Sequence, residues 1–382
     1  MTMEISNTSA MMIDKNHQII STLGIGGAGE VYSVRNNITN TMYAAKFARK
    51  DLKVTQAKKL MLLQRERDTM EDLNEHPNIL TSYHLYKKRK AIPQPPSFDF
   101  SKQEFDIHLT TSPFHLIEYC ENGSFISYMR NQSTLPENIV VFYAEQLISA
   151  IEYIHYKGYA HLDIKLDNIL LDDYFNIRLS DFGSALKVDD NPFTVFRRGT
   201  PKYMAPEVFQ LQDGKEFDAY KADIYSLGVC LYLMLFKRFP VYDGASYPAT
   251  MELFSNPETL DSSPFDCDKS RWTSLSPEIR RIIVACLNQD PNQRPNSQQL
   301  VENFFLPPQN QSIEEMVFEE MQDRRSKYEQ SRHEKAIIEQ KFIRPVQCEE
   351  NPVYDKHENA PNTRPVCNKS GSSTNVSTHS RN

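Results

Sequence analysis

Glycine is scarce in this chain, and the place where it gathers constrains the fold more than any other feature. Only 12 of the 382 residues are glycine, yet Gly24, Gly26, Gly27 and Gly29 fall within six residues. Alternating apolar and polar segments flank them, which predicts two strands joined by a glycine-rich turn. Backbone N–H groups in such a turn can approach an anionic phosphate closely. A hairpin without a ligand is the alternative, because a lone glycine pattern is a weak signal.

The segments around the glycines predict a small sheet. EVYSVR, directly after the cluster, alternates as a strand does, whereas a dinucleotide-binding fold would place a helix there. The strand pattern of residues 17–47 continues through TMYAAKF. A helix over residues 56–74 and two further strands, at 79–86 and 114–118, complete this first part of the chain.

Beyond residue 119 the apolar pattern becomes helical. Helices are predicted over residues 137–157, 219–236, 277–287 and 297–305. Thr134 and Glu137 have the spacing of a capping box at the start of the first of these helices. The chain therefore predicts an α+β organisation, with a small β-rich part followed by a larger helical part.

Composition restricts the class of protein. A chain with 40% hydrophobic and 24% charged residues fits an ordinary globular protein, and its formal charge of −7 gives no reason to expect a nucleic-acid partner. The longest apolar stretch, residues 224–236, is shorter than the roughly 20 residues of a membrane span and predicts a buried helix. Six cysteines without a CxxC pair, and no secretory pattern at the N-terminus, predict an intracellular, cytoplasmic protein, with nuclear entry left open.

Charged residues follow the glycine cluster at informative positions. Lys46 ends the strand segment AAK, and Glu66 lies on the predicted helix after it, so an ion pair would hold Lys46 toward a phosphate. Each residue alone also has a plainer explanation, as a strand lysine and as a solvated helix glutamate. The segment HLDIKLDN, residues 161–168, is followed by DFG at 181–183 and by GTPKYMAPE at 199–207.

Together with GIGGAGEV and AAK, these motifs resemble those of the eukaryotic protein kinases, in the same order and at matching spacings over residues 17–305. Lys165 and Thr200 resemble the serine/threonine branch. The resemblance implies a bilobal fold. A small antiparallel sheet with one helix would form the N-lobe, residues 17–118, and a larger, mainly helical C-lobe would span residues 122–305.

The resemblance also implies a site for ATP and Mg²⁺. Catalytic roles fall to Asp163, which would accept and orient the substrate hydroxyl, to Lys165 near the γ-phosphate, and to Lys46 and Asn168. Asn168 and Asp181 would bind the metal. The residues implied to bind the nucleotide are Leu23, Gly24, Gly26, Gly29, Val31, Ala44, Lys46, Glu66, Glu118, Cys120, Ser124, Leu170 and Asp181.

Other matches to the family imply structural roles. Glu207 is expected to pair with Arg294, and Asp223 is expected to hold the backbone of the catalytic loop. The three residues His161, Phe182 and Met70 are expected to stack between the lobes.

Three departures from the family pattern stand out. Leu162 replaces an arginine that usually meets a phosphate on the activation loop, so we expect no such pairing here. Thr194 is the candidate phosphosite of that loop, with an exposed, unmodified threonine as the alternative. Ala28 replaces an aromatic residue at the tip of the glycine turn. The loop over residues 87–112 is long, and its KKRK run is either a docking or import patch or, as we favour, solvated.

The implied function is transfer of the ATP γ-phosphate to serine and threonine hydroxyls of protein substrates. A pseudokinase-like scaffold that binds nucleotide without transfer is the alternative, which the full set of chemical residues disfavours. We expect no nucleic-acid partner and no membrane span.

Both ends of the chain differ from its centre. Residues 1–16 are expected to be flexible, and residues 306–382 to form a charged tail, partly helical and then disordered. The tail helix has a short apolar stripe, which leaves three interpretations open: packing on the catalytic domain, binding a regulatory partner, or a linker. Its members are Ile313, Met316, Val317 and Met321.

Overall fold

The computed structural model describes residues 11–26, 29–48, 55–87, 109, 111–130, 132–189, 191–240, 263, 265–303 and 311–342. The chain divides into two compact units, Met1–Ala336 and Ile337–Asn382. The first unit contains the N-lobe, the C-lobe and most of the last helix.

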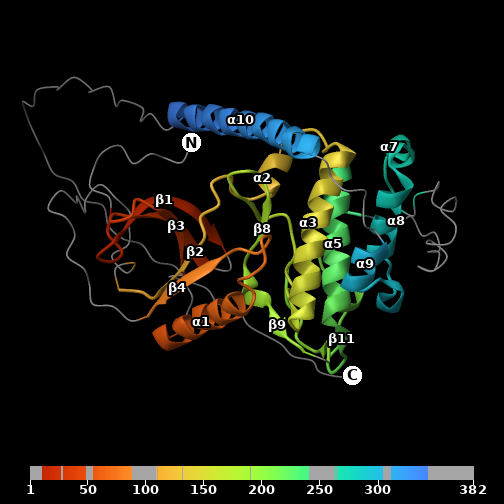
Figure 1. The fold of residues 1–382 in the computed structure, drawn as a ribbon, viewed down its shortest axis with the longest axis horizontal. Coiled ribbons are helices and arrows are strands. Elements are labelled where there is room, and N and C mark those ends of the chain that lie inside the picture. Colours follow the sequence, from red (N-terminus) through yellow and green to blue (C-terminus); the bar gives the residue numbers. More distant parts are fainter. Residues whose placement is uncertain are drawn as a thin grey trace, which may run out of the picture. The chain divides into compact units, whose positions relative to one another are not determined.

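The N-lobe is a five-stranded antiparallel sheet with one helix beside it (Figure 1). The strands lie in the order β1-β2-β3-β5-β4. Thr55 is the N-cap of the helix α1 (Gln56–Asp72), and its side chain accepts from the backbone N–H of Lys58. The predicted strands and helix are thus present. The strand bounds are β1 (His17–Gly26), β2 (Gly29–Asn36), β3 (Met42–Phe47), β4 (Ser82–Tyr86) and β5 (Phe114–Ile117).

The segment before β1 is folded where the sequence predicts a flexible end. Met11 is 2% exposed and Ile13 is fully buried, and both join the N-lobe core. The backbone N–H of Ile19 donates to the carbonyl of Met11, and that of Ile13 donates to His17. The prediction was wrong for residues 11–16 because a short apolar run within a polar segment gave no strand pattern. Residues 1–10 lie outside the described residues.

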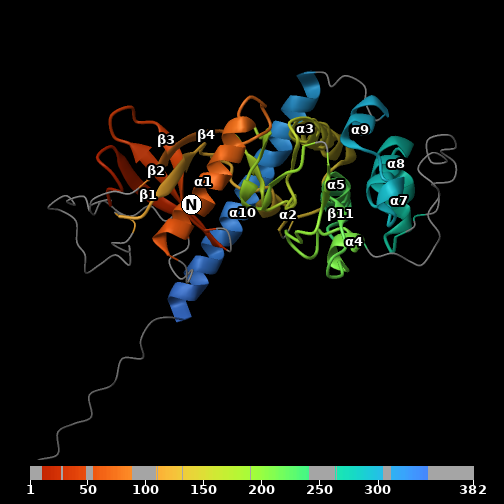
Figure 2. The same cartoon turned by 90° about the horizontal axis from the view of Figure 1, so that it is seen from below.

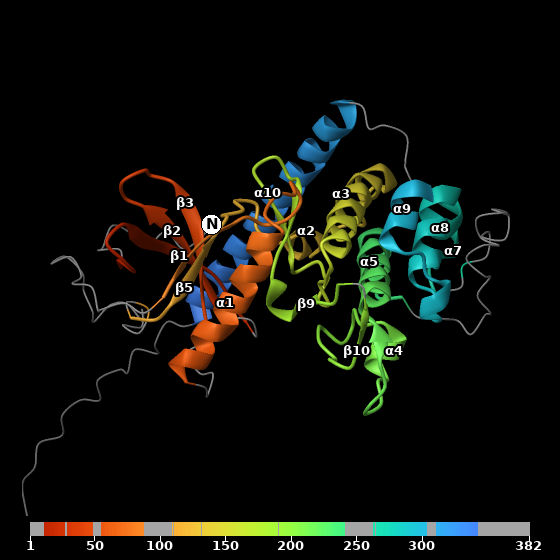
Figure 3. The same ribbon diagram turned by 60° about the horizontal axis from the view of Figure 1, so that its bottom comes forward.

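The C-lobe is mainly helical, as predicted. Two long helices, α3 (Glu137–Tyr156) and α5 (Ala219–Phe236), pack together in its core (Figures 1 and 3). The shorter helices are α2 (Ile126–Met129), α4 (Pro206–Phe209), α7 (Lys269–Ser274), α8 (Pro277–Cys286) and α9 (Ser297–Asn303). The sequence predicted α8 and α9 but not α2, α4 and α7, because these three have too few residues to show a periodic pattern.

Short strand pairs complete the C-lobe and carry its loops. The pairs are β6 (Tyr159–Ala160) with β9 (Leu186–Lys187), β7 (Ile169–Leu171) with β8 (Ile177–Leu179), and β10 (Phe193–Thr194) with β11 (Phe217–Asp218).

The predicted capping box of α3 is absent. The N-cap is Pro136, with no side-chain hydrogen bond to the helix, and the carboxylate of Glu137 instead accepts from the backbone N–H of Ser276. The carbonyl of Thr134 accepts from Arg324. A tertiary partner, Ser276, therefore takes the Glu137 carboxylate that the sequence assigned to a local cap.

Helix α5 is long and apolar enough to cross a membrane by length and composition alone. However, 83% of that stretch is buried inside the protein. It is the buried helix that the sequence predicts.

The tail forms a helix, α10 (Gln311–Phe342), which lies beside α2 of the C-lobe (Figures 1 and 2). Three members of the predicted stripe are buried, while Met316 is 48% exposed. Phe318 also meets the ring of Phe175 edge-on at 5.5 Å. Of the three interpretations of this segment, packing on the C-lobe is the one the structure supports. Residues 343–382, with the predicted disorder, lie outside the described residues.

Candidate active site

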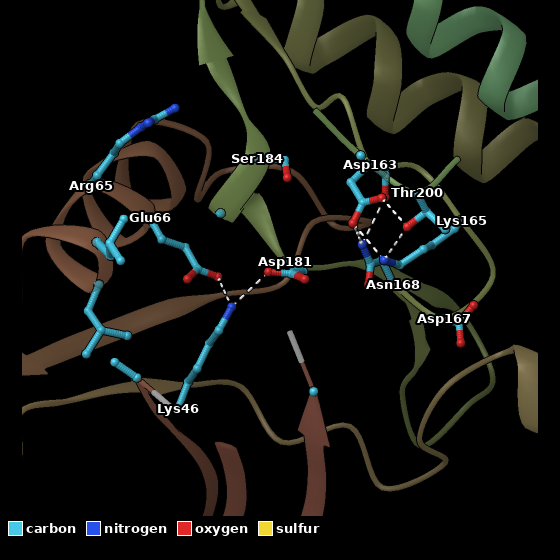
Figure 4. A pocket seen from close by; sticks show the side chains of 16 residues that line it. Lys46, Arg65, Glu66, Asp163, Lys165, Asp167, Asn168, Asp181, Ser184 and Thr200 are labelled. Carbon is cyan, nitrogen blue, oxygen red and sulfur yellow. Dashed lines mark hydrogen bonds and ion pairs between the residues drawn. The ribbon is translucent and has the colours of Figure 1, made fainter. Parts of the chain in front are cut away.

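Lys46 is held by two carboxylates in the interior of the protein. It lies on β3 opposite Val31 of β2 and is 5% exposed. Its Nζ donates to Oε1 of Glu66 at 2.6 Å and to Oδ1 of Asp181 at 2.8 Å (Figure 4). Glu66 comes from α1, and Asp181 lies two residues after the end of β8. The predicted ion pair between Lys46 and Glu66 is therefore confirmed.

Burial and ion pairing act in opposite directions on these charges. Burial lowers the pKa of Lys46, but the carboxylates of Glu66 and Asp181 outweigh burial and raise it above its ordinary value. Burial raises the pKa of Asp181, but the Lys46 ammonium and its hydrogen bond outweigh burial and lower it. Lys46 and Asp181 consequently keep their charges at neutral pH.

Asp163 is held by hydrogen bonds to both carboxylate oxygens. Oδ2 accepts from Nζ of Lys165 at 2.7 Å, and Oδ1 accepts from the hydroxyl of Thr200 at 2.7 Å (Figure 4). Lys165 also donates to Thr200 at 2.8 Å, and Nδ2 of Asn168 donates to the backbone carbonyl of Asp163 at 2.9 Å. These contacts fix the orientation of a carboxylate that is 9% exposed.

The residues around Lys46 and those around Asp163 line one cavity of about 660 Å³ between the lobes. Gly26 of β1 lies at the same cavity, together with Lys46 and Asp181 on one side and Asp163 on the other (Figure 4). The cavity thus brings together an ammonium group, two side chains with oxygen ligands for a metal ion, and a carboxylate held by hydrogen bonds. These are the groups that phosphoryl transfer requires, and they belong to Lys46, Asn168, Asp181 and Asp163.

Gly29 lies close to the neighbouring strand, which is a different contact from the predicted approach to a phosphate. A Cβ at Gly29 would lie 2.3 Å from the carbonyl oxygen of Phe47, so no side chain fits between β2 and β3 there. Gly24 and Gly26 have open space around them. The strand after the cluster is β2, as predicted, while Gly27 and Ala28 lie outside the described residues.

The residues predicted to bind the base come together from both lobes. Ala44 of β3 pairs with Ile117 of β5, and Ser124 forms a bridge with Leu170 of β7. Val31 and Leu170 pack, partly buried, against the core that includes Ala44, Ile117 and Cys120, whereas Leu23 is 43% exposed on β1.

Two of the three polar groups of Glu118 are already hydrogen-bonded within the protein. Its backbone N–H donates to the carbonyl of Thr81 at 2.9 Å, and its carboxylate pairs with Arg178 at 2.9 Å. The group of Glu118 left for a base is consequently its carbonyl.

Asn168 and Asp181 are suited to share a magnesium ion with substrate phosphates. Both line the cavity. Because Nδ2 of Asn168 donates a hydrogen bond to Asp163, the amide oxygen of Asn168 is the atom that can bind a metal ion. Among the described residues, no group of three or more His, Cys, Asp and Glu side chains forms a metal cage. Mg²⁺ typically needs only one or two protein carboxylates or amides when phosphates supply further oxygens.

The predicted structural pairs are confirmed. Arg294 donates to both carboxylate oxygens of Glu207, at 2.6 and 2.8 Å. Asp223, fully buried, accepts from the backbone N–H groups of His161 and Leu162 at 2.7 Å each. The ring of His161 lies 4.8 Å from that of Phe182, which confirms this predicted contact. Met70 is buried in the core that includes Phe182, and its stacking on the two rings stays a prediction.

Thr194 is neither exposed nor a simple phosphosite. It is 6% exposed, its backbone pairs with Phe217, and its hydroxyl accepts from the N–H of Phe196. Leu162 is likewise buried, 7% exposed, with a left-handed φ of 61°. Lys87 is the only residue of the KKRK run that the structure describes.

A comparison with protein-family models decides the family. The model of the protein kinase domain matches residues 17–306. The chain belongs to the protein kinase family. The bilobal kinase fold predicted from the sequence is the fold observed.

Curated relatives of this chain are named as kinases, and the first of them as a serine/threonine-protein kinase. The chain is 30% identical over 284 residues to CBL-interacting serine/threonine-protein kinase 2 of Arabidopsis thaliana, covering 74% of this chain and 54% of that protein. It is 35% identical over 237 residues to Citron Rho-interacting kinase of Homo sapiens, covering 61% of this chain and 11% of that protein. The chain thus spans about half the length of the first relative, and much less of the second.

Two contacts in the kinase site were missed from the sequence. Thr200 served there only as a mark of the serine/threonine branch, yet its hydroxyl donates to Asp163. Ser180 donates to the carbonyl of Asn168 at 2.8 Å and steadies the loop from behind. The position of Thr200 in GTPKYMAPE was a usable signal, whereas nothing marked Ser180 apart from its place before DFG.

Proposed function

We propose that this protein is a serine/threonine protein kinase that transfers the γ-phosphate of Mg·ATP to hydroxyl groups of protein substrates. The observation that carries the proposal is the arrangement around Asp163. Its carboxylate is held from both sides by Lys165 and Thr200 and faces the cavity that Lys46 and Asp181 line. The kinase names of the relatives support the same reaction class.

Each residue would have a distinct part in the transfer. Lys46, kept in place by Glu66, binds phosphate oxygens of the nucleotide. Asp163 orients the substrate hydroxyl and accepts its proton as the oxygen attacks phosphorus. Lys165 contacts the transferred group. Magnesium, when bound by Asn168 and Asp181, supplies positive charge against the phosphate oxygens.

The test measures phosphate transfer. Purified protein is incubated with Mg·ATP and a generic serine- and threonine-containing protein, beside the variant Asp163→Asn, and the phosphoamino acids formed are identified. We expect phosphoserine or phosphothreonine with the natural chain, and at least about a hundredfold less with the variant. Nucleotide binding without any transfer would favour the nucleotide-binding scaffold instead.

We also propose an intracellular location and a regulatory partner at the tail. The free cysteines Cys120, Cys230, Cys267 and Cys286 suit a reducing compartment. The relative named as CBL-interacting suggests that kinases of this kind have partners.

A further inference from the structure

Helix α10 reaches the linker between the lobes, residues 118–124. The guanidinium of Arg325 donates to Oδ1 of Asn122 and lies 3.7 Å from a carboxylate oxygen of Glu121. Glu329, one turn further along α10, accepts from Nε of Arg325 at 3.2 Å and helps to orient it. The C-terminal segment therefore contacts the short stretch of chain from which the base of a nucleotide would be bound.

Asn122 connects Arg325 to the segment that follows β7. It is 7% exposed, its Nδ2 donates to the carbonyl of Asp172 at 2.6 Å, and its own carbonyl accepts from the hydroxyl of Tyr128 at 2.8 Å. With Arg325 at its oxygen, the Asn122 amide is hydrogen-bonded at both ends. Arg325 of α10 consequently supplies one of the two hydrogen bonds that hold this side chain.

The contacts continue to the residue predicted to meet the base. The carboxylate of Asp172 lies 3.1 Å from the guanidinium of Arg178, and Nε of Arg178 donates to Glu118 at 2.9 Å. Glu118 begins the linker, and its carbonyl is the group left for a base. A continuous set of polar contacts thus joins α10 to the base-binding end of the linker.

A neighbouring arginine fixes the position of α10. Arg324 is 1% exposed, and its guanidinium donates to the carbonyls of Tyr128, Ser133 and Thr134 at 2.9–3.2 Å. With three apolar side chains of the helix also buried, α10 has one docked position on this lobe. Arg325, the next residue, is therefore held at the linker.

We propose that Arg325 is a positioning residue for the nucleotide: it holds the linker, through Asn122, in the conformation that presents Glu118 and Cys120 to the base. The C-terminal segment then sets the affinity for nucleotide without touching it. This inference rests on the proposed function, since it assigns the same site a dependence on α10.

The test compares nucleotide binding and turnover in variants of the full chain. For Arg325→Ala we expect the Kd for Mg·ADP, measured by calorimetry, and the KM for ATP to rise about fivefold, with kcat unchanged. Arg325→Lys retains a donor and is expected to recover part of the affinity. Asn122→Ala should raise the Kd at least as much as Arg325→Ala, because it also removes the donor to the carbonyl of Asp172. Adding Arg325→Ala to Asn122→Ala should change the Kd little, because their shared contact is already lost. The matched control is Lys327→Ala, an exposed side chain of the same helix that pairs with Asp323.

The outcomes separate this inference from the proposed function. Equal affinity for Mg·ADP in the natural chain and Arg325→Ala overturns the inference and leaves the kinase intact. A loss of kcat with unchanged affinity overturns it as well. Failure of the natural chain to bind Mg·ADP overturns the proposed function, and this inference with it.

Discussion

The guanidinium of Arg65 donates to the carbonyl oxygen of Ala185 at 2.6 Å. This contact ties α1 to the segment after the DFG motif, and Arg198 reaches the same oxygen from further along that segment at 3.4 Å. Arg65 directly precedes Glu66, the partner of Lys46, so the contact holds the helix in the position that the ion pair requires. Two arginines, one from α1 and one from the segment after the DFG motif, thus share one backbone acceptor.

The first prediction concerns Thr194, which the structure buries. We expect Thr194→Ala to keep its kinase activity within about twofold, since the change removes one hydroxyl and the backbone pairing can remain. Thr194→Glu should lower both activity and thermal stability, because it places a carboxylate in a buried position. Rates of substrate phosphorylation and melting temperatures measure the two effects. Loss of activity in the alanine variant, restored by glutamate, would show that phosphorylation of Thr194 switches the enzyme on.

The second prediction tests the contact between Arg65 of α1 and the carbonyl of Ala185. Arg65→Ala removes a charged hydrogen bond worth roughly 1.5–3 kcal/mol, so we expect kcat/KM to fall by about tenfold or more. Arg67→Ala is the matched control on the same helix, because the partners of Arg67, Asp68 and Glu71, lie within α1. An equal fall in both variants would mean that the loss comes from the helix itself rather than from its tie to Ala185.

The third prediction is a pH dependence of stability that His115 causes. This side chain is fully buried on β5, opposite Lys46. Burial, reinforced by the nearby charges of Lys46 and Arg67, lowers its pKa from 6.5 to about 3. In the unfolded chain the imidazole takes up a proton near its ordinary pKa, whereas the folded chain resists protonation until about pH 3. The unfolded state therefore binds more protons between these values, and stability falls as the pH is lowered.

The slope that one such group causes is at most about 1.4 kcal/mol per pH unit. We expect denaturant unfolding at pH 7.5, 6 and 5 to show this loss in the natural chain and a smaller loss in His115→Gln. His84→Gln, an exposed histidine of the neighbouring strand whose charge has the smallest of the named effects on the pKa of His115, is the control and should change the slope much less than His115→Gln. The same slope in the natural chain and His115→Gln would assign the pH dependence to other groups.

The site was predictable where chemistry fixes residue type and spacing together. Lys46 and Asp163 belong to motifs whose order alone implies a fold, and Glu66 lies on the helix predicted after Lys46. The strand after the glycines followed from simple alternation. Thr194 was misjudged because its burial depends on pairing with Phe217, a residue far along the chain that no local pattern connects to it. Arg324 was missed for a similar reason: an arginine in a charged helix suggests a solvated side chain until its acceptors on another segment are known.

The last prediction is that α10 is part of the folded catalytic domain, with Arg324 as its main polar anchor. The guanidinium is 1% exposed, and it donates to the carbonyls of Tyr128 in α2 and of Ser133 and Thr134 between α2 and α3, and to Glu320 on its own helix. Arg324→Ala leaves those carbonyls buried without a donor, and we expect the free energy of unfolding to fall by about 3–5 kcal/mol. Arg332→Ala, an exposed arginine of the same helix, should change it by less than about 0.5 kcal/mol. Denaturant unfolding of the full chain measures both, and similar stability of the two variants would mean that α10 is only loosely attached.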